Sequence, residues 1–361
     1  MAEVKNNRNS SIELLRIIAM FMIVISHYFF HGGVDIDSVS LGFNRVLIQW
    51  GGLGNLGVVI FVAITGYFMC TGTLKAKSLF RTAFSSWFYS YVILAVIIIV
   101  YGVPEIKSFI RALLPITLGE HWFVTVYIAL MLFSPFINKL ISVITRRQFA
   151  VLSCTMLILW AVVPTFTKMS FYSREFTQCL MFYLLGAYLR MYPDNFLSRK
   201  HNAVLVTVLS FALMMLSAVV CDILSQNFGI FSGGSYWYAR NSVFVIAAAL
   251  SLLVIFTKLN IKSKAVNTIA SCTFGVYLIH DNQLLRTILW QDVLHTTDYA
   301  DSPFMIVHML VCSLIVFALC AVVEFLRKTL IEKPVLRLYD IAEPKVKSSA
   351  LYNNFIMKEK K

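Results

Sequence analysis

The chain has 361 residues, of which 59% are hydrophobic and only 14% are charged. A soluble globular domain carries about 25% charged residues, so the composition excludes an ordinary soluble protein and indicates a membrane protein with many spans. The formal net charge of +13 does not indicate nucleic-acid binding. The basic residues form short clusters between apolar runs, which is the pattern of cytoplasmic loops rather than of a binding surface.

The sequence offers no sign of a disulfide framework or a metal centre. All seven cysteines lie in apolar runs, no CxxC motif occurs, and no spacing is that of zinc ligands. We therefore interpret the cysteines as small buried side chains and expect no metal. The first apolar run lacks a small-residue cleavage site, so we interpret it as a retained helix rather than a signal peptide.

A membrane-spanning helix needs about 20 mostly apolar residues. We therefore predict an all-α, polytopic integral membrane protein with about ten transmembrane helices. They lie near residues 12–30, 50–72, 82–103, 121–142, 149–165, 176–190, 202–222, 238–257, 269–290 and 303–326. Residues 1–340 are expected to form one membrane-embedded domain, and residues 341–361 a short basic cytoplasmic tail.

The connecting loops predict the orientation of these helices. Basic residues are concentrated in every second loop and in the C-terminal tail, whereas the other loops carry acidic and aromatic residues. By the positive-inside rule, both termini are expected in the cytoplasm. No outer loop is long enough to fold as a domain, so any chemistry is expected within the helix bundle.

The first predicted span contains two ionisable residues, Arg16 and His27. Such residues are costly in lipid, so each indicates a functional site. They are eleven residues apart, which places them on nearly one helical face and about 16 Å apart along the axis. His27 is a candidate general base, and Arg16 a candidate ligand for an anion. The alternatives are an interhelical hydrogen bond for His27 and an ion pair of Arg16 with Glu13 or Glu324.

Further residues of interest lie in the second and ninth predicted spans. Thr65, Gly66 and Tyr67 follow one another in the second span, where small residues permit close helix packing. His280 and Asp281 are expected midway along the ninth helix, where a polar pair is costly unless it is used or well paired. Adjacent helical residues point about 100° apart, so we do not expect these two to form a dyad with each other.

A basic loop follows the second predicted span and contains Lys75, Lys77 and Arg81. These basic residues either set the orientation of the neighbouring spans and attract anionic lipid, or they bind the phosphates of a nucleotide-containing cofactor. The chain has no GxxxxGK[ST], GxGxxG, HExxH or GxSxG motif, which argues against an ATPase, a Rossmann enzyme, a zincin and a hydrolase.

Five motifs in order resemble those of the membrane-integral acyltransferase 3 family, whose members O-acetylate polysaccharides and related carbohydrates. They are the Arg16-x10-His27 signature, IFVAITGYF (60–68), His121-Trp122-Phe123, TFGVYLIH (273–280) and Glu332-Lys333-Pro334. Together they span residues 9–336, and this resemblance implies a stand-alone form without the extracellular esterase-like domain of some members. It also implies location in a bacterial plasma membrane.

The resemblance implies that His27 is the catalytic base and that Arg16 orients it or binds the acyl donor. The family often has an Arg-x-x-Arg pair after the second helix. Here Arg81 takes one position, Ser78 occupies the other, and Lys75 or Lys77 is expected to compensate. These three basic residues are the predicted binding site for acetyl-CoA.

We therefore predict an acyl-CoA-dependent O-acetyltransferase that acts on a hydroxyl of a cell-surface or lipid-linked glycan. The candidate substrate-binding residues are Thr65, Tyr67, His121, Trp122, Tyr277, His280 and Glu324. Tyr67, Tyr277 or the backbone near Gly66 is expected to stabilise the oxyanion. The expected partners are acyl-CoA, the glycan acceptor and membrane lipid. The alternatives are a glycan or glycan-precursor transporter and a structural partner in polysaccharide synthesis.

Overall fold

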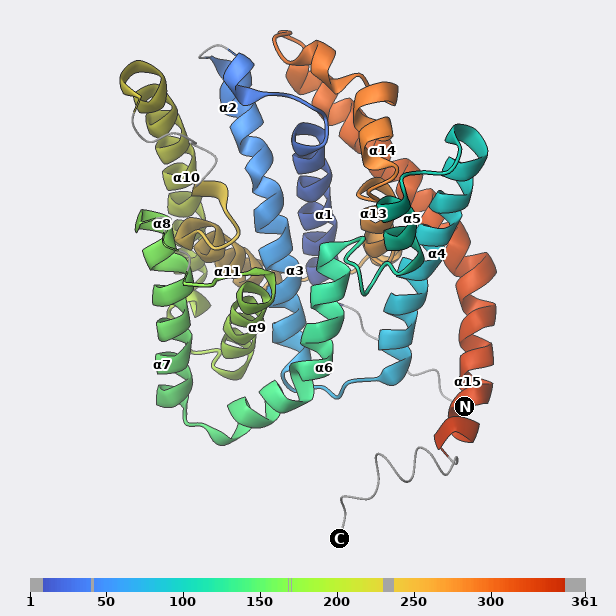
Figure 1. Ribbon diagram of the computed structural model, residues 1–361. Coiled ribbons are helices and arrows are strands. Elements are labelled where there is room, and N and C mark those ends of the chain that lie inside the picture. Colours follow the sequence, from blue (N-terminus) through green and yellow to red (C-terminus); the bar gives the residue numbers. More distant parts are fainter. Residues whose placement is uncertain (1–8, 40–41, 168, 170, 230–236, 348–361) are drawn as a thin grey trace.

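The computed structural model describes residues 9–39, 42–167, 169, 171–229 and 237–347, and every regular element in these ranges is a helix (Figure 1). Seven helical segments are long and apolar enough to cross a membrane. They are α1 (Ser10–Phe30), α2 to α3 (Phe43–Met69), α4 (Ala76–Tyr101), α6 (Trp122–Val143), α7 to α8 (Arg146–Thr167), α10 (Lys200–Phe228) and the segment Met305–Pro344, which begins with α14 (Met305–Arg327). The predicted all-α membrane fold is therefore confirmed.

Three predicted spans differ from single long helices. Helices α9 (Glu175–Met191) and α11 (Val243–Thr257) are shorter than a full span. The segment predicted at 269–290 is interrupted, and it contains the end of α12 (Lys264–Ala270), all of α13 (Thr273–His280) and the start of a π-helix, η6 (Ile288–Val293). The count of ten spans and the location of the termini stay predictions.

Several of these spans are composed of more than one element, and short elements connect the spans. The composite spans consist of α2 (Phe43–Trp50), η2 (Gly51–Leu53) and α3 (Gly54–Met69), of α7 (Arg146–Leu157), η3 (Ile158–Val162) and α8 (Val163–Thr167), and of α14, η8 (Lys328–Glu332) and α15 (Lys333–Lys347). The short connecting elements are η1 (Ile36–Ser38), α5 (Ile106–Leu113), η4 (Phe196–Ser198) and η7 (Thr296–Tyr299). Helix α15 extends past the boundary predicted at residue 341, and residues 348–361 of the predicted tail lie outside the described part of the chain.

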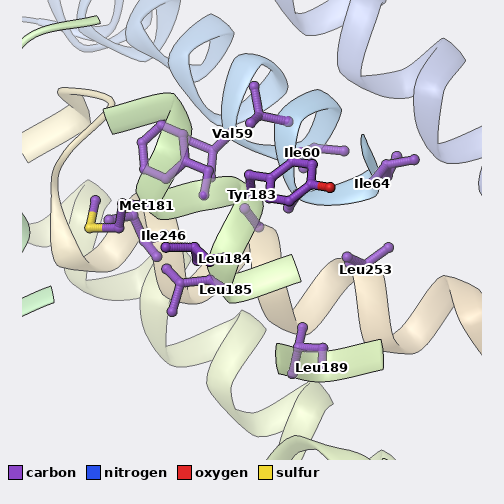
Figure 2. Close-up of a cluster of buried hydrophobic side chains, with 14 of the residues drawn as sticks. Val59, Ile60, Ile64, Met181, Tyr183, Leu184, Leu185, Leu189, Ile246 and Leu253 are labelled. Atoms are coloured by element: carbon purple, nitrogen blue, oxygen red, sulfur yellow. The ribbon is translucent and has the colours of Figure 1, made fainter. Parts of the chain in front are cut away.

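The short helices α9 and α11 are buried against α3 in the larger hydrophobic core. Figure 2 shows this cluster, in which Ile60 of α3, Leu185 of α9 and Ile246 of α11 are among the labelled side chains. A helix that is apolar on every side is stable when other helices surround it. Protein packing therefore replaces lipid contact around these two helices.

Glycines allow α3 and α9 to pack backbone against backbone. A Cβ atom added to Gly66 would lie 2.0 Å from the carbonyl oxygen of Tyr183, and one added to Gly186 would lie 2.1 Å from that of Ala63. Small residues permit this approach between membrane helices. Gly66 lies inside the continuous helix α3, so the prediction of a loosened, oxyanion-binding backbone near Gly66 is wrong, and packing explains this glycine.

Candidate active site

A cavity of about 360 Å³ lies between helices α1, α3, α4, α6, α13 and α14. Arg16 and His27 both line it, so it follows α1 over about three turns, or roughly 16 Å. Its volume is within the range of small-molecule sites. Arg16 and His27, which the sequence placed on one face of the first helix, thus line the same cavity in the structure.

The end of the cavity near Arg16 is lined by charged side chains. Arg16 is 30% exposed and its Nη1 donates to Glu13 Oε1 at 2.7 Å, which confirms the predicted local pairing. Glu324 also lines the cavity, but it accepts hydrogen bonds from Tyr89 and Arg327. The predicted Arg16–Glu324 ion pair is therefore wrong, because Glu324 is paired one turn along its own helix.

A buried charge network forms the wall next to these residues. Arg327 lies between Glu324, at 2.7 Å, and Glu332, at 2.5 Å. Glu332 also lies 3.2 Å from Arg81, which is half exposed and lines the cavity. Because Glu332 is held by two arginines, the network fixes Arg81 at the mouth of the cavity.

The other predicted donor-binding residues lie apart from the cavity lining. Lys77 donates to Asp340 of α15 at 2.6 Å, and Lys75 is the exposed N-cap residue of α4. Lys328, which the sequence analysis did not select, lines the cavity and donates to the carbonyl oxygen of Ser271. The cavity therefore has three basic residues near one end, namely Arg16, Arg81 and Lys328.

At the other end of the cavity, polar side chains surround His27. Its Nδ1 lies 2.9 Å from His280 Nε2 and 3.7 Å from Asp281 Oδ1. Asp281 Oδ1 also accepts from His31 Nε2 at 3.0 Å, and Arg286 Nη1 lies 3.7 Å from the same oxygen. Helix α13 ends at His280, with Asp281 as its C-cap, so the predicted position midway along a helix is wrong.

The hydrogen bonds of His280 determine which nitrogen of His27 carries a proton. His280 Nδ1 lies 2.5 Å from the carbonyl oxygen of Val276, and a carbonyl oxygen can only accept, so this nitrogen carries the hydrogen. In the neutral ring, His280 Nε2 then accepts from His27 Nδ1–H. His27 Nε2 is left with its lone pair, which is the form that a general base requires.

Aromatic residues of α6 and α13 close the wall beside His27. Tyr277 and Trp122 line the cavity, and the ring of Tyr277 packs edge-to-face against His121. The buried Tyr277 hydroxyl forms no hydrogen bond of normal geometry with the described residues, although Asp281 interacts with it electrostatically. His121 itself is fully buried, and its Nε2–H donates to the carbonyl oxygen of Leu278.

The two remaining predicted residues belong to α3. Thr65 lines the cavity and donates to the carbonyl oxygen of Phe61. Tyr67 lies elsewhere, with the guanidinium of Arg190 at 5.2 Å from its ring centroid. The cavity lining therefore includes Thr65 and excludes Tyr67.

His31 was not among the site residues predicted from the sequence, although a signal for it was present. His31 follows His27 by four residues, so both lie on one face of α1. Lys328 had a similar signal, since it follows Glu324 by four residues. Asp281 could not be placed from the sequence, because its contact with α1 depends on where α13 ends.

Comparison with known proteins supplies the family. Neither the curated proteins nor the solved structures contain a match to this chain. A family model described as an acyltransferase domain matches residues 9–325, a range that includes α1 with Arg16 and His27 and nearly all of α14. The chain therefore belongs to the acyltransferase 3 family of multi-pass membrane acyltransferases.

Proposed function

We propose that the protein transfers an acetyl group from cytoplasmic acetyl-CoA to a hydroxyl of a cell-surface or lipid-linked glycan. The observation that carries this proposal is that one cavity is lined both by the basic residues Arg16, Arg81 and Lys328 and by His27. Its length along α1 suits a long, slender acyl carrier with an anionic head. The head would lie by Arg16, Arg81 and Lys328, and the thioester would lie by His27.

The positions of the partners of His27 support opposite entry for the two substrates. His31 lies one turn of α1 beyond His27, on the side away from Arg16. The side chains of His31 and Arg286 are 19% and 34% exposed. An acceptor hydroxyl can therefore approach His27 from this side while the donor occupies the cavity.

The proposed transfer uses the lone pair of His27 Nε2. This nitrogen accepts the proton of the acceptor hydroxyl, the oxygen attacks the thioester carbon, and the carbon–sulfur bond breaks. The leaving thiolate then takes the proton from His27, which restores the neutral ring. The same lone pair also permits a two-step route in which His27 is acylated first. In either route, the proposed donor to the oxyanion is the hydroxyl of Tyr277, which lines the same cavity as His27.

The test uses purified protein in lipid nanodiscs with labelled acetyl-CoA and a cell-envelope glycan fraction. We expect thiol release and transfer of label by the wild type, and a loss of at least about 10²-fold in His27→Ala, the lower range of general-base catalysis. His201→Ala, which removes an exposed imidazole of α10, is the control and should retain activity. A folded wild type that neither binds acetyl-CoA nor releases thiol would overturn the proposal and favour glycan transport.

A further inference from the structure

Three potential metal ligands meet on the side of His27 that faces away from Arg16. The ligand atoms of His27, His31 and Asp281 all lie within 4.8 Å of one another. Two of the separations are 3.0 Å, from His31 Nε2 to Asp281 Oδ1, and 3.7 Å, from His27 Nδ1 to the same oxygen. Ligand atoms of a tetrahedral zinc site are about 3.3–3.5 Å apart, which follows from metal–ligand distances of about 2.0–2.2 Å.

The backbone around these ligands is fixed before any ion arrives. The two histidines are spaced i, i+4 at the end of α1, with His31 as the C-cap residue in helical conformation, and this is the spacing with which a helix presents two imidazoles to one zinc ion. The carbonyl oxygen of His31 accepts from Gln291, and the N–H of Asp281 donates to the carbonyl oxygen of Tyr277. Binding would therefore require small side-chain movements rather than folding of a loop.

We propose that His27, His31 and Asp281 form an inhibitory site for a divalent transition-metal ion such as Zn²⁺. The site has imidazole and carboxylate ligands, which suit zinc, and a fourth position open to water. The side chains of His27 and His31 are 17% and 19% exposed, so an ion can reach them. Arg286 must turn away from Asp281, which its 34% exposure permits.

The inhibitory effect follows from the ring nitrogen that the metal would occupy, and this step rests on the proposed function. A metal ion on His27 Nδ1 takes the lone pair of that nitrogen, so the proton of the neutral ring moves to Nε2. The hydrogen bond from His27 to His280 is lost in the exchange. Nε2–H can neither accept the proton of a hydroxyl nor attack a thioester, so metal-bound His27 is inactive.

The binding test uses tag-free, full-length protein in nanodiscs after treatment with a chelator. Co²⁺ alone is the probe, because its visible absorption distinguishes tetrahedral coordination. We expect one site per chain in the wild type and an affinity at least about tenfold lower in His31→Gln, since even indirect ligand partners contribute 10–100-fold. Glutamine can still donate a hydrogen bond to Asp281, which protects the fold. His201→Ala is the matched control and should bind like the wild type.

The activity test follows turnover with acetyl-CoA as Zn²⁺ is added and then removed with EDTA. We expect reversible inhibition of the wild type, and His31→Gln, measured relative to its own metal-free turnover, should need at least about tenfold more Zn²⁺. The proposal is overturned if Co²⁺ does not bind the wild type, if His31→Gln binds it equally well, or if Zn²⁺ increases turnover. Because Co²⁺ binding is measured without any substrate, its result tests the metal site whether or not the protein is an acetyltransferase.

Discussion

His280 Nε2 of α13 accepts a hydrogen bond from His27 Nδ1 of α1, with the two nitrogens 2.9 Å apart. The carbonyl oxygen of Val276 holds the opposite nitrogen of His280 in its protonated form. A backbone carbonyl thus determines, through one imidazole, which nitrogen of a second imidazole is basic. His280 is a positioning residue in this arrangement, since it contacts His27 and does not line the cavity.

Substitution of His280 should therefore reduce turnover without weakening donor binding. In His280→Ala, His27 loses the acceptor that holds Nδ1 protonated, and we expect kcat to fall by roughly 10–10²-fold while KM for acetyl-CoA stays unchanged. Asp281, at 3.7 Å from His27 Nδ1, limits the loss. Steady-state kinetics and ¹⁵N spectra of labelled histidine test both statements.

His308→Ala is the control for this experiment, because His308 is bonded to the hydroxyl of Tyr28, the neighbour of His27. The His308→Ala substitution removes an imidazole from the same region but leaves the hydrogen bonds of His27 unchanged. Equal losses of kcat in the two variants would show that His280 acts through packing alone.

The basic residues near the cavity mouth should contribute unequally to donor binding. Arg81 lines the cavity, whereas Lys77 pairs with Asp340 outside it. We expect Arg81→Ala to raise KM for acetyl-CoA by about 10–10²-fold, the value of one charge-assisted hydrogen bond of about 1.5–3 kcal/mol. Lys77→Ala should change KM by less than about fivefold, because exposed ion pairs contribute little.

We expect Arg81→Ala to fold like the wild type, because Glu332 keeps its ion pair with Arg327. Thermal unfolding of Arg81→Ala should therefore match that of the wild type. A larger effect of Lys77 than of Arg81 on KM would contradict the position assigned to the donor head.

The sequence predicted best what depends on one helix alone. Arg16 and His27 share a face because helical periodicity is a local property, and the pairing of Arg16 with Glu13 follows from the same rule. The partner of Glu324 was predicted wrongly because Arg327, three residues further along the same helix, was not considered as its partner. The ion pair of Arg327 depends on how the helices pack, and the contacts of His280 and Asp281 with His27 depend on where α13 ends. The length of an apolar segment does not determine either feature.

The number of long helices was harder to predict than the fold class. Hydropathy identifies apolar segments, but it does not distinguish a helix that faces lipid from one that is surrounded by protein. Helices α9 and α11 are short and mostly buried, so their apolar composition reflects the core of Figure 2 as much as the membrane.

The packing of α3 on α9 should depend on Gly66. In Gly66→Ala the new Cβ atom meets the carbonyl oxygen of Tyr183 at 2.0 Å, which is backbone and cannot rotate away. We expect a loss of stability of about 1–3 kcal/mol, the usual effect of overpacking. In Gly72→Ala the nearest atom is 3.6 Å away, so this control should unfold within a few degrees of the wild type. Thermal unfolding in detergent checks both, and equal midpoints would contradict the close contact.

The buried network behind the cavity mouth should contribute more to stability than a surface ion pair of the same type. Glu324 accepts from Tyr89 at 2.7 Å and from Arg327 at 2.7 Å, and its side chain is almost fully buried. In Glu324→Gln, Arg327 retains Glu332, so we expect a loss of about 2–3 kcal/mol. Breaking a buried pair completely costs about 3–5 kcal/mol.

Asp194→Asn is the matched control, because Asp194 forms an ion pair with Arg146 in which both side chains are about half exposed or more. Such exposed pairs contribute about 0–1 kcal/mol. Thermal unfolding of both variants in the same detergent provides the comparison. If Glu324→Gln were no less stable than Asp194→Asn, then Tyr89 and Arg327 would not need the carboxylate. Glu324 would in that case be available to a ligand in the cavity that it lines.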